Sequence, residues 1–277
     1  MSDARPSRIA LVLDRPVEDV SAVVASARAA GGIDRAAPHH GDGSVAQDVH
    51  WGGRMQRAVV RATEEDGAPL LRTDLAIAGD GFAEGLARQA SLLAALARVI
   101  PGRVRGVRDL SARVERDEVW LTRAAAGVVD PADAVVASAG EVPAPDGGGA
   151  RASRNTVGWA LTHGAARLGV PDLELYGVPV AALDRALAEL NHVAGLLAVG
   201  GLGAPLALSD GTPVRLVPVL EAWSTLPATW PGLGRAGVDR GPGLDGPRAT
   251  LSVLHRPRLG RHRLDLDGVR ERLRGRQ

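Results

Sequence analysis

Two hairpin signals, one in each half of the chain, constrain the fold more than any other feature of the sequence. Each signal is a pair of apolar runs that flank a short turn rich in acidic residues and glycine: 55–63 and 70–78 around 64–67, and 206–208 and 214–220 around Asp210-Gly211. Asp-Gly between apolar runs favours a tight turn between antiparallel strands. The sequence therefore predicts antiparallel pairing in both halves of the chain.

Two long stretches carry the spacing of an amphipathic helix. Residues 82–100 repeat apolar side chains at helical intervals and end at Pro101-Gly102. Residues 181–199 do the same and end at Gly200-Gly201. Side chains three and four positions apart share one face of a helix, so both stretches predict helices that are buried along one side.

Shorter elements fill the remaining chain. Helices are predicted at 17–30, 156–168 and 268–274, and strands at 9–13, 119–122, 173–178 and 249–254. A helix through residues 119–122 is an open alternative, and the polar, Gly- and His-rich residues 34–53 predict a loop. This mixture of hairpins and helices predicts an α+β fold of antiparallel or mixed sheets, with helices packed mainly on one face.

A Gly- and Pro-rich segment predicts the division into two subdomains. Residues 141–151 include Pro143, Pro145 and three consecutive glycines, which is typical of a linker. We therefore expect an N-terminal α+β subdomain at 1–140 and a C-terminal one at 152–277, which ends in a basic tail.

Composition excludes several kinds of chemistry. The chain of 277 residues contains no Cys and no Lys, so all 33 basic residues are Arg, as codon bias in a high-GC bacterial genome would produce. Disulfides, thiolate chemistry, Schiff bases and a phosphate-binding P-loop lysine are therefore excluded. The net charge is +1 and aromatic residues are 3%, so neither an electrostatic field nor stacking platforms favour nucleic acid as a partner.

The sequence predicts no targeting segment. The apolar run 9–13 is too brief for a signal-peptide core, and no run of about 18 apolar residues lacks charges. We therefore expect a cytoplasmic protein that does not span a membrane.

His163 and the carboxylates that follow it are the first candidate site. Asp172 and Glu174 are two positions apart, so on a strand they would point to the same face. His163 with these carboxylates could form a general-base pair, and His163 with His192 could bind a metal ion. A structural interpretation, in which these side chains fix the turn, is favoured over either site.

The same stretch carries a family resemblance. Thr162-His163-Gly164, followed by Gly169-x-Pro171-Asp172-Leu173-Glu174, resembles a signature of uncharacterised bacterial domain families. Those families combine a Thr-His-Gly turn, a Gly-x-Pro-[Asp/Glu]-Leu-Glu strand and a long helix, and residues 181–199 fit that helix. The resemblance extends over about residues 119–220. It implies a domain of this kind and brings no activity with it.

Two other stretches are candidates for binding. Three His and two Asp within residues 39–50 could ligate a metal, although a solvated loop is favoured because their spacing matches no known site. A partner surface is suggested by tryptophans in a Trp-Pro-Gly loop and by the basic tail: Trp223, Trp230, Arg256, Arg258, Arg261 and Arg263. Exposed Trp and Arg are frequent anchors of interfaces.

Common catalytic motifs are absent from the chain, including the G-x-S-x-G elbow, the P-loop and H-E-x-x-H. The function predicted is therefore that of a non-catalytic protein-interaction or regulatory protein, with no cofactor and with another protein as its partner. The alternative is a metal-dependent or general-base enzyme centred on His163 with Asp172 and Glu174.

Overall fold

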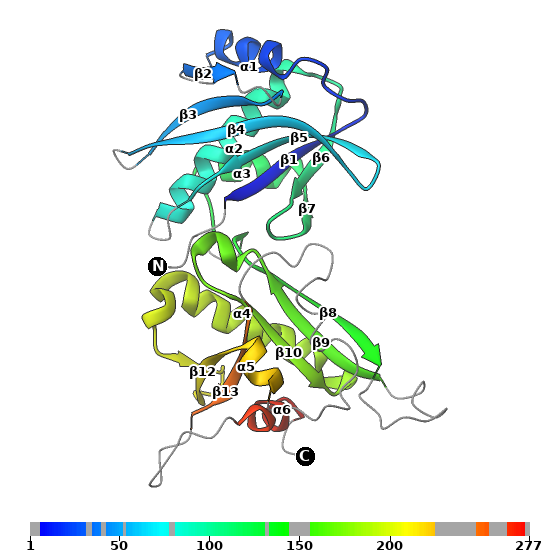
Figure 1. Ribbon diagram of the computed structural model, residues 1–277, viewed down its shortest axis with the longest axis vertical. Coiled ribbons are helices and arrows are strands. Elements are labelled where there is room, and N and C mark those ends of the chain that lie inside the picture. The colour runs from blue at the N-terminus through cyan, green and yellow to red at the C-terminus, as the bar shows by residue number, and fades with distance from the viewer. Residues whose placement is uncertain are drawn as a thin grey trace. The chain divides into compact units, whose positions relative to one another are not determined.

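The computed structural model describes residues 6–31, 35–39, 43–51, 54–77, 81–130, 133–143, 156–224, 248–254 and 265–274 (Figure 1). Residue contacts divide the chain into two units. Unit 1 comprises Met1–Ala134 and Arg167–Gly169, and unit 2 comprises Val135–Ala166 and Val170–Gln277. Each unit contains one β-sheet with helices packed against it, so the expected α+β class is confirmed.

The sheet of unit 1, sheet A, has the strand order β2-β3-β4-β5-β1-β6-β7, and each neighbouring pair is antiparallel. Its strands are β1 (Ser7–Leu13), β2 (Arg35–His39), β3 (Val45–Trp51), β4 (Arg54–Glu65), β5 (Ala68–Leu75), β6 (Val104–Asp109) and β7 (Val114–Arg116). The hairpin predicted around 64–67 is confirmed as β4 and β5. Asp66 and Gly67 at its tip both have positive φ, which this tight turn requires.

The described helices of unit 1 are α1 (Val20–Ala29), α2 (Phe82–Val99) and α3 (Glu118–Ala125). In Figure 1, α2 and α3 lie behind sheet A, and α2 packs on β1, β3 and β5. Leu86, Ala90 and Leu93 of α2 are fully buried, which confirms the amphipathic spacing of residues 82–100. Asp19 and Asp117 cap α1 and α3 by accepting a backbone N–H of the first turn.

The face of sheet A away from α2 carries ion pairs within β5 and between neighbouring strands. Asp74 of β5 lies 2.8 Å from Arg72 and 3.6 Å from Arg61 of β4. Asp48 of β3 lies 3.6 Å from Arg57 of β4. Arg61 and Arg72 stand directly opposite each other in the register, so the Asp74 carboxylate offsets a repulsion that would otherwise destabilise the pairing.

The sheet of unit 2, sheet B, has the order β11-β12-β13-β10-β9-β8, with β10 and β13 parallel and the other pairs antiparallel. Its strands are β8 (Val136–Pro143), β9 (Thr156–His163), β10 (Asp172–Val178), β11 (Leu206–Ala207), β12 (Pro213–Pro218) and β13 (Arg248–Val253). The second predicted hairpin is confirmed as β11 and β12. Hydrogen bonds from Thr212 hold the pKa of the Asp210 carboxyl in its turn below the usual value.

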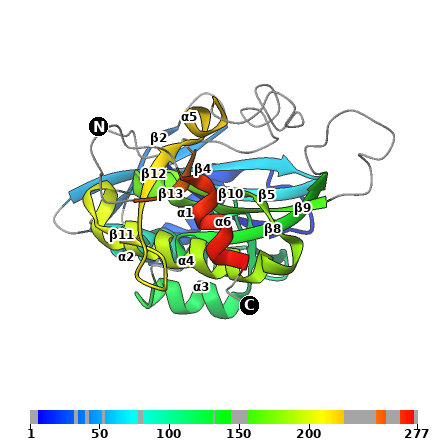
Figure 2. The ribbon, with the colours of Figure 1, turned by 90° about the horizontal axis from the view of Figure 1, so that it is seen from below.

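The described helices of unit 2 are α4 (Leu183–Gly200), α5 (Val219–Ser224) and α6 (Leu266–Arg274). Short 3₁₀ helices occupy Val180–Ala182 and Gly201–Gly203. A third, Ala165–Leu168, is divided between the units, because Arg167 and Leu168 belong to unit 1. Figure 2 shows α4 running along β8, β9 and β10, against which it packs, while α6 packs on β13 and β10. Ala186, Leu190 and Val193 of α4 are fully buried, so the helix predicted at 181–199 is confirmed.

By length and composition, one helical stretch among the described residues, Val180–Gly203, is apolar enough to cross a membrane. The core helix of a soluble protein meets the same criterion. About 33% of this stretch is buried, and the buried face of α4 packs against sheet B.

The helix predicted at 156–168 is wrong. Residues Thr156–His163 form β9, between β8 and β10, and only Ala165–Leu168 form a helical turn. Thr, Val and Trp in this stretch favour a pleated surface. Gly158 has a specific role, because the Leu183 side chain occupies the space that a side chain there would need. The Gly and Pro that seemed to end a long helix end the 3₁₀ helix instead.

Two further assignments change. The loop predicted at 34–53 is wrong, because residues of this stretch form β2 and β3, which pair with each other. The strand predicted at 119–122 is also wrong, and the helix alternative is confirmed as α3. Asp117 begins this helix by accepting from the Trp120 N–H at 2.6 Å.

The division between the units falls earlier than the Gly- and Pro-rich segment. Unit 1 comprises the chain up to Ala134 and also Arg167–Gly169, whereas the sequence suggested a boundary at 141–151. The strands on either side of that segment, β8 and β9, pair along their whole length. Residues 141–143 of that segment therefore belong to β8 of sheet B, and its other residues lie outside the described part of the chain.

Candidate functional site

A groove of about 1030 Å³ opens in unit 1 between the C-terminal half of α2, the helix α3 and the strands β6 and β7. Small residues form part of its apolar lining and leave space open: Ala94 and Ala97 of α2, Ala125 of α3, and Gly102 and Gly106 around the start of β6. Larger apolar residues complete this lining: Ile100, Pro101, Val104, Val107 and Leu121. This volume lies at the upper end of the range for ligand sites, which is roughly 300–1,000 Å³.

The local sequence explains why these elements meet. Pro101-Gly102 ends α2, and Gly102 has φ +72°, so the chain reverses at once into β6. The Ser91 hydroxyl of α2 donates to the carbonyl oxygens of Ala87 and Ala125 at 2.9 and 3.0 Å, which joins α2 to α3. The walls of the groove are therefore held by a tight turn and by a hydrogen bond between helices.

A β-bulge aims one arginine at the groove. The register between β1 and β6 shifts where Val12 faces Gly106 and Leu13 faces Val104, which leaves Arg105 without an opposing residue. Bulges re-aim side chains and are frequent beside functional sites. Arg105 is exposed and lines the groove.

Two arginines line the groove from different elements without an ion-pair or hydrogen-bond partner among the described residues. Arg98 comes from the last turn of α2 and Arg105 from β6, and both are exposed. Arg88 and Arg103 of the same unit, by contrast, are engaged: Arg88 lies 4.0 Å from Glu84, and Arg103 donates to the carbonyl oxygen of Pro16 at 2.5 Å. The groove thus presents two uncommitted cations.

Arg116 of β7 adds a third, largely buried cation to the lining, with 14% of its side chain exposed. It donates to the carbonyl oxygen of Asp133 at 2.8 Å and lies 5.0 Å from the centroid of the Trp120 ring. Burial lowers the pKa of Arg116, while the carboxylates of Asp109 and Asp133 act to raise it. Arginine is the most basic of the side chains, so Arg116 keeps its charge at neutral pH.

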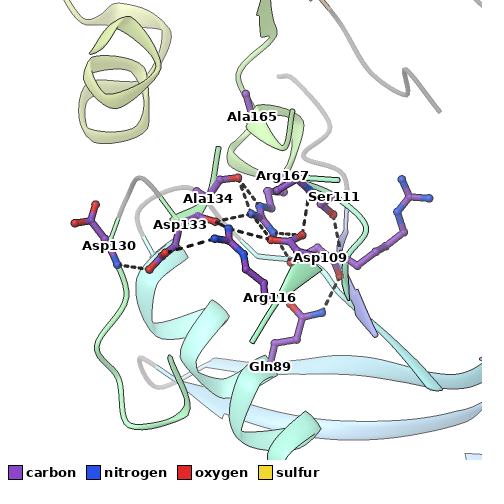
Figure 3. Close-up of polar contacts among 12 residues, drawn as sticks. Gln89, Asp109, Ser111, Arg116, Asp130, Asp133, Ala134, Ala165 and Arg167 are labelled. Carbon is purple, nitrogen blue, oxygen red and sulfur yellow. Dashed lines mark hydrogen bonds and ion pairs between the residues drawn. The ribbon is translucent and has the colours of Figure 1, made fainter. Parts of the chain in front are cut away.

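A buried network holds Arg116 in place (Figure 3). The Asp109 carboxylate of β6 is fully buried and accepts hydrogen bonds from the two terminal nitrogens of Arg167, at 3.1 and 3.0 Å. Arg167 is 1% exposed and also donates to the carbonyl oxygens of Asp133 and Ala134. The same Asp109 carboxylate lies 3.8 Å from Arg116, so the network fixes this wall of the groove.

The lining of the groove has charges and a shape suited to binding, but few side chains suited to acid–base or nucleophilic catalysis. It contains no His, and two of its three carboxylates are engaged: Glu115 binds Arg108 at 2.6 Å and Asp117 caps α3. A general base needs a proton acceptor placed beside a nucleophile, and the Ser91 hydroxyl of the lining already donates to backbone carbonyls. The groove can bind an anion, and its described residues present no nucleophile–base pair.

The structure places His163 at the end of β9, where its Nε2 lies 2.9 Å from the Ser138 Oγ of β8. The Asp172 carboxylate accepts from the Ala165 N–H at 3.0 Å and from the Thr162 hydroxyl at 3.3 Å. These contacts join the end of β9 to the start of β10. Asp172 thus has a role in the turn, as the structural interpretation of the sequence expected.

Glu174 has a different environment. It is 1% exposed, and its carboxylate accepts from Arg248 of β13 at 3.0 Å, in the parallel pair at the centre of sheet B. His192 is exposed on α4. Among the described residues, no group of three or more His, Asp or Glu side chains is placed to hold a metal ion.

The other predicted binding residues are only partly described. Within residues 39–50, His39 lies in β2, His50 is exposed in β3, and Asp48 lies beside Arg57. Trp223 belongs to α5, but its side chain lies outside the described residues, as do five further predicted residues: Trp230, Arg256, Arg258, Arg261 and Arg263. Their role in partner binding stays a prediction.

No model of a protein family matches the chain, and no curated protein and no solved structure matches it either. The resemblance of residues 162–174 to bacterial domain families therefore stays a prediction. What the protein does has to be argued from its own geometry, in which the groove of unit 1 is the most developed feature.

Proposed function

We propose that the protein is a non-catalytic interaction protein and that the groove of unit 1 binds a short acidic segment of a partner protein. The observation that carries this proposal is the placement of Arg98 and Arg105, which line one groove from α2 and β6 and have no partner among the described residues. Exposed arginine forks recognise carboxylates through paired hydrogen bonds. Acidic side chains are the groups that match this lining.

The remaining lining favours a peptide over a nucleic acid. It contains no aromatic side chain on which a base could stack. It also includes Glu115, Asp117 and Glu118, so a ligand has to place its negative charges at Arg98 and Arg105 and neutral groups beside these carboxylates. A continuous phosphate backbone, which is charged at every nucleotide, cannot do this. A peptide can place carboxylates against Arg98 and Arg105 and small apolar side chains against the alanines of α2.

Replacing both arginines should remove this binding. A fluorescein-labelled peptide of alternating Glu and Ala provides the probe, and fluorescence anisotropy provides the measurement. We expect Arg98→Gln with Arg105→Gln to raise the Kd at least about tenfold, because two charge-assisted hydrogen bonds of roughly 1 kcal/mol or more each are lost. A peptide with Gln in place of Glu should bind the native protein as weakly as this variant binds the acidic peptide.

The matched control removes the same charge elsewhere in unit 1. Arg28 of α1 and Arg88 of α2 are exposed and do not line the groove. Arg28→Gln with Arg88→Gln should leave the Kd within about twofold, since neither side chain lines the groove and charges at the exposed surface are screened at physiological salt. An equal loss in both double variants would show that only net charge matters, and would refute the groove as the site.

One observation favours the enzyme alternative, the 2.9 Å approach of Ser138 Oγ to His163 Nε2. A Ser–His pair at this distance can act as a nucleophile with its general base in acyl transfer. A fluorophosphonate probe distinguishes the two proposals. Labelling of Ser138 that His163→Gln abolishes would support the enzyme, whereas our proposal predicts no labelling and unchanged peptide binding in that variant.

A further inference from the structure

The outer edge of β8 differs from the other sheet edges of the described chain. The edges of sheet A are β2, with five residues that include Pro38, and β7, with three residues. The other edge of sheet B is β11, with two residues. Short strands and proline are the usual means by which proteins keep an edge from pairing with another chain. β8 has eight residues, and its proline stands at the last of them.

The outer edge of β8 presents backbone with little side-chain cover. Ser138, Ala139, Gly140 and Glu141 are exposed. Ser138 contacts His163 at 2.9 Å, and Glu141 accepts from the Thr156 hydroxyl at 3.0 Å, so both polar side chains turn toward β9. A side chain at Gly140 would meet nothing within 4 Å. Within the described part of the chain, no strand lies beside this edge, so its outward N–H and C=O groups can be reached by another strand.

We propose that β8 is the strand through which two copies of this chain pair, antiparallel and around a two-fold axis at Ala139. In this register, residue 136 faces 142, Ala137 faces Glu141, and Ala139 faces its own copy. A two-fold interface uses the same patch on both subunits. Each backbone hydrogen bond that one copy makes across the axis is therefore repeated by the other copy. This inference concerns unit 2 and does not rest on the groove of unit 1.

The charge pattern of β8 suits this pairing. Glu141 is the one charged residue of the strand, and the two-fold register sets it opposite a neutral Ala137. The two Glu141 side chains would stand four positions apart, about 14 Å along the strands at roughly 3.4 Å per residue. This separation exceeds the Debye length of roughly 8 Å at physiological salt. The pairing therefore brings no two like charges together.

A second copy is a better occupant than an extended peptide of another protein. Peptides that add a strand to a sheet gain affinity from the backbone and specificity from pockets for alternate side chains. Alanine and glycine at 137, 139 and 140 provide no such pockets. A copy of β8 needs none, because its small side chains let the two backbones approach and Ala139 packs against its own copy.

The test uses the full chain and two lysine variants of the same strand. Ala139→Lys places two lysines opposite each other at the axis, where directly facing like charges destabilise a pair. Ala137→Lys adds the same charge to the same face of β8 but places it opposite Glu141 of the second copy. Sedimentation velocity between about 1 and 100 μM then reports the association, and circular dichroism confirms that each variant is folded.

We expect the native chain to form dimers in this range, Ala139→Lys to raise the dissociation constant at least about tenfold, and Ala137→Lys to leave it unchanged or lower it. A native chain that is monomeric throughout would overturn the proposal and would leave β8 open to another occupant. Dimers that both variants weaken equally, or that neither affects, would overturn the two-fold register and with it the proposal.

Discussion

Replacing Asp109 by Asn is expected to lower the free energy of unfolding by about 3–5 kcal/mol, the largest effect of any single change considered. The Asp109 carboxylate is fully buried and accepts hydrogen bonds from both terminal nitrogens of Arg167. An Asn keeps the shape but leaves the buried guanidinium without its counter-charge. Since domains of this size are stable by only roughly 5–15 kcal/mol, the loss should appear as a large shift in a urea unfolding curve.

Glu115→Gln is the matched control, because it removes a carboxylate from the adjacent strand. Glu115 binds Arg108 at 2.6 Å, but its side chain is 62% exposed, so this change should cost no more than about 1 kcal/mol. A double variant, Asp109→Leu with Arg167→Met, should be more stable than Asp109→Asn alone, since the uncompensated charge is gone. If Asp109→Asn were no worse than Glu115→Gln, the network would not hold unit 1 together.

Gly158→Ala is expected to destabilise the protein by roughly 1–3 kcal/mol, although it adds a single methyl group. The added Cβ would collide with the Leu183 side chain and would lie 3.0 Å from the carbonyl oxygen of Val178. Leu183 can move only partly, because it begins α4, and the carbonyl is backbone. The first turn of α4 would therefore have to shift away from β9.

Gly140→Ala on the neighbouring strand is the control for this prediction. Nothing lies within 4 Å of a Cβ built there, and the residue does not need a positive φ. Its stability should change by no more than about 0.5 kcal/mol, or increase because the unfolded chain loses freedom. Thermal unfolding of both variants by circular dichroism gives the comparison. Equal Tm values would show that α4 does not pack closely on β9 at this point.

Residues 82–100 and the turn at 64–67 show what the sequence could predict. A helix buried along one side repeats its apolar residues at 3.6-residue intervals, and a tight hairpin needs residues that accept positive φ, so both features can be recognised locally. Thr156–His163 shows where this fails. Its apolar positions fit a helix as well as a strand, and the choice was made by its partners β8 and β10, which local pattern does not reveal.

The candidate groove was not predictable for a related reason. Arg98 and Arg105 look like ordinary surface residues in the sequence, and their convergence depends on the turn after α2 and on the bulge opposite Val12. Asp109 and Arg167 are 58 residues apart, so their pairing leaves no local trace. His163 can be recognised as a candidate by its residue type, whereas the groove arises from four elements, α2, α3, β6 and β7, that meet only in the fold.

Amide hydrogen exchange of the full chain, with and without the Glu–Ala peptide, tests the proposed binding site most directly. The peptide should slow exchange at the end of α2, at the start of β6 and in α3, which surround the groove. The face of sheet A that carries Arg61 and Arg72 provides a second arginine-rich surface for comparison. Protection confined to that face, or binding without protection around the groove, would contradict the proposal.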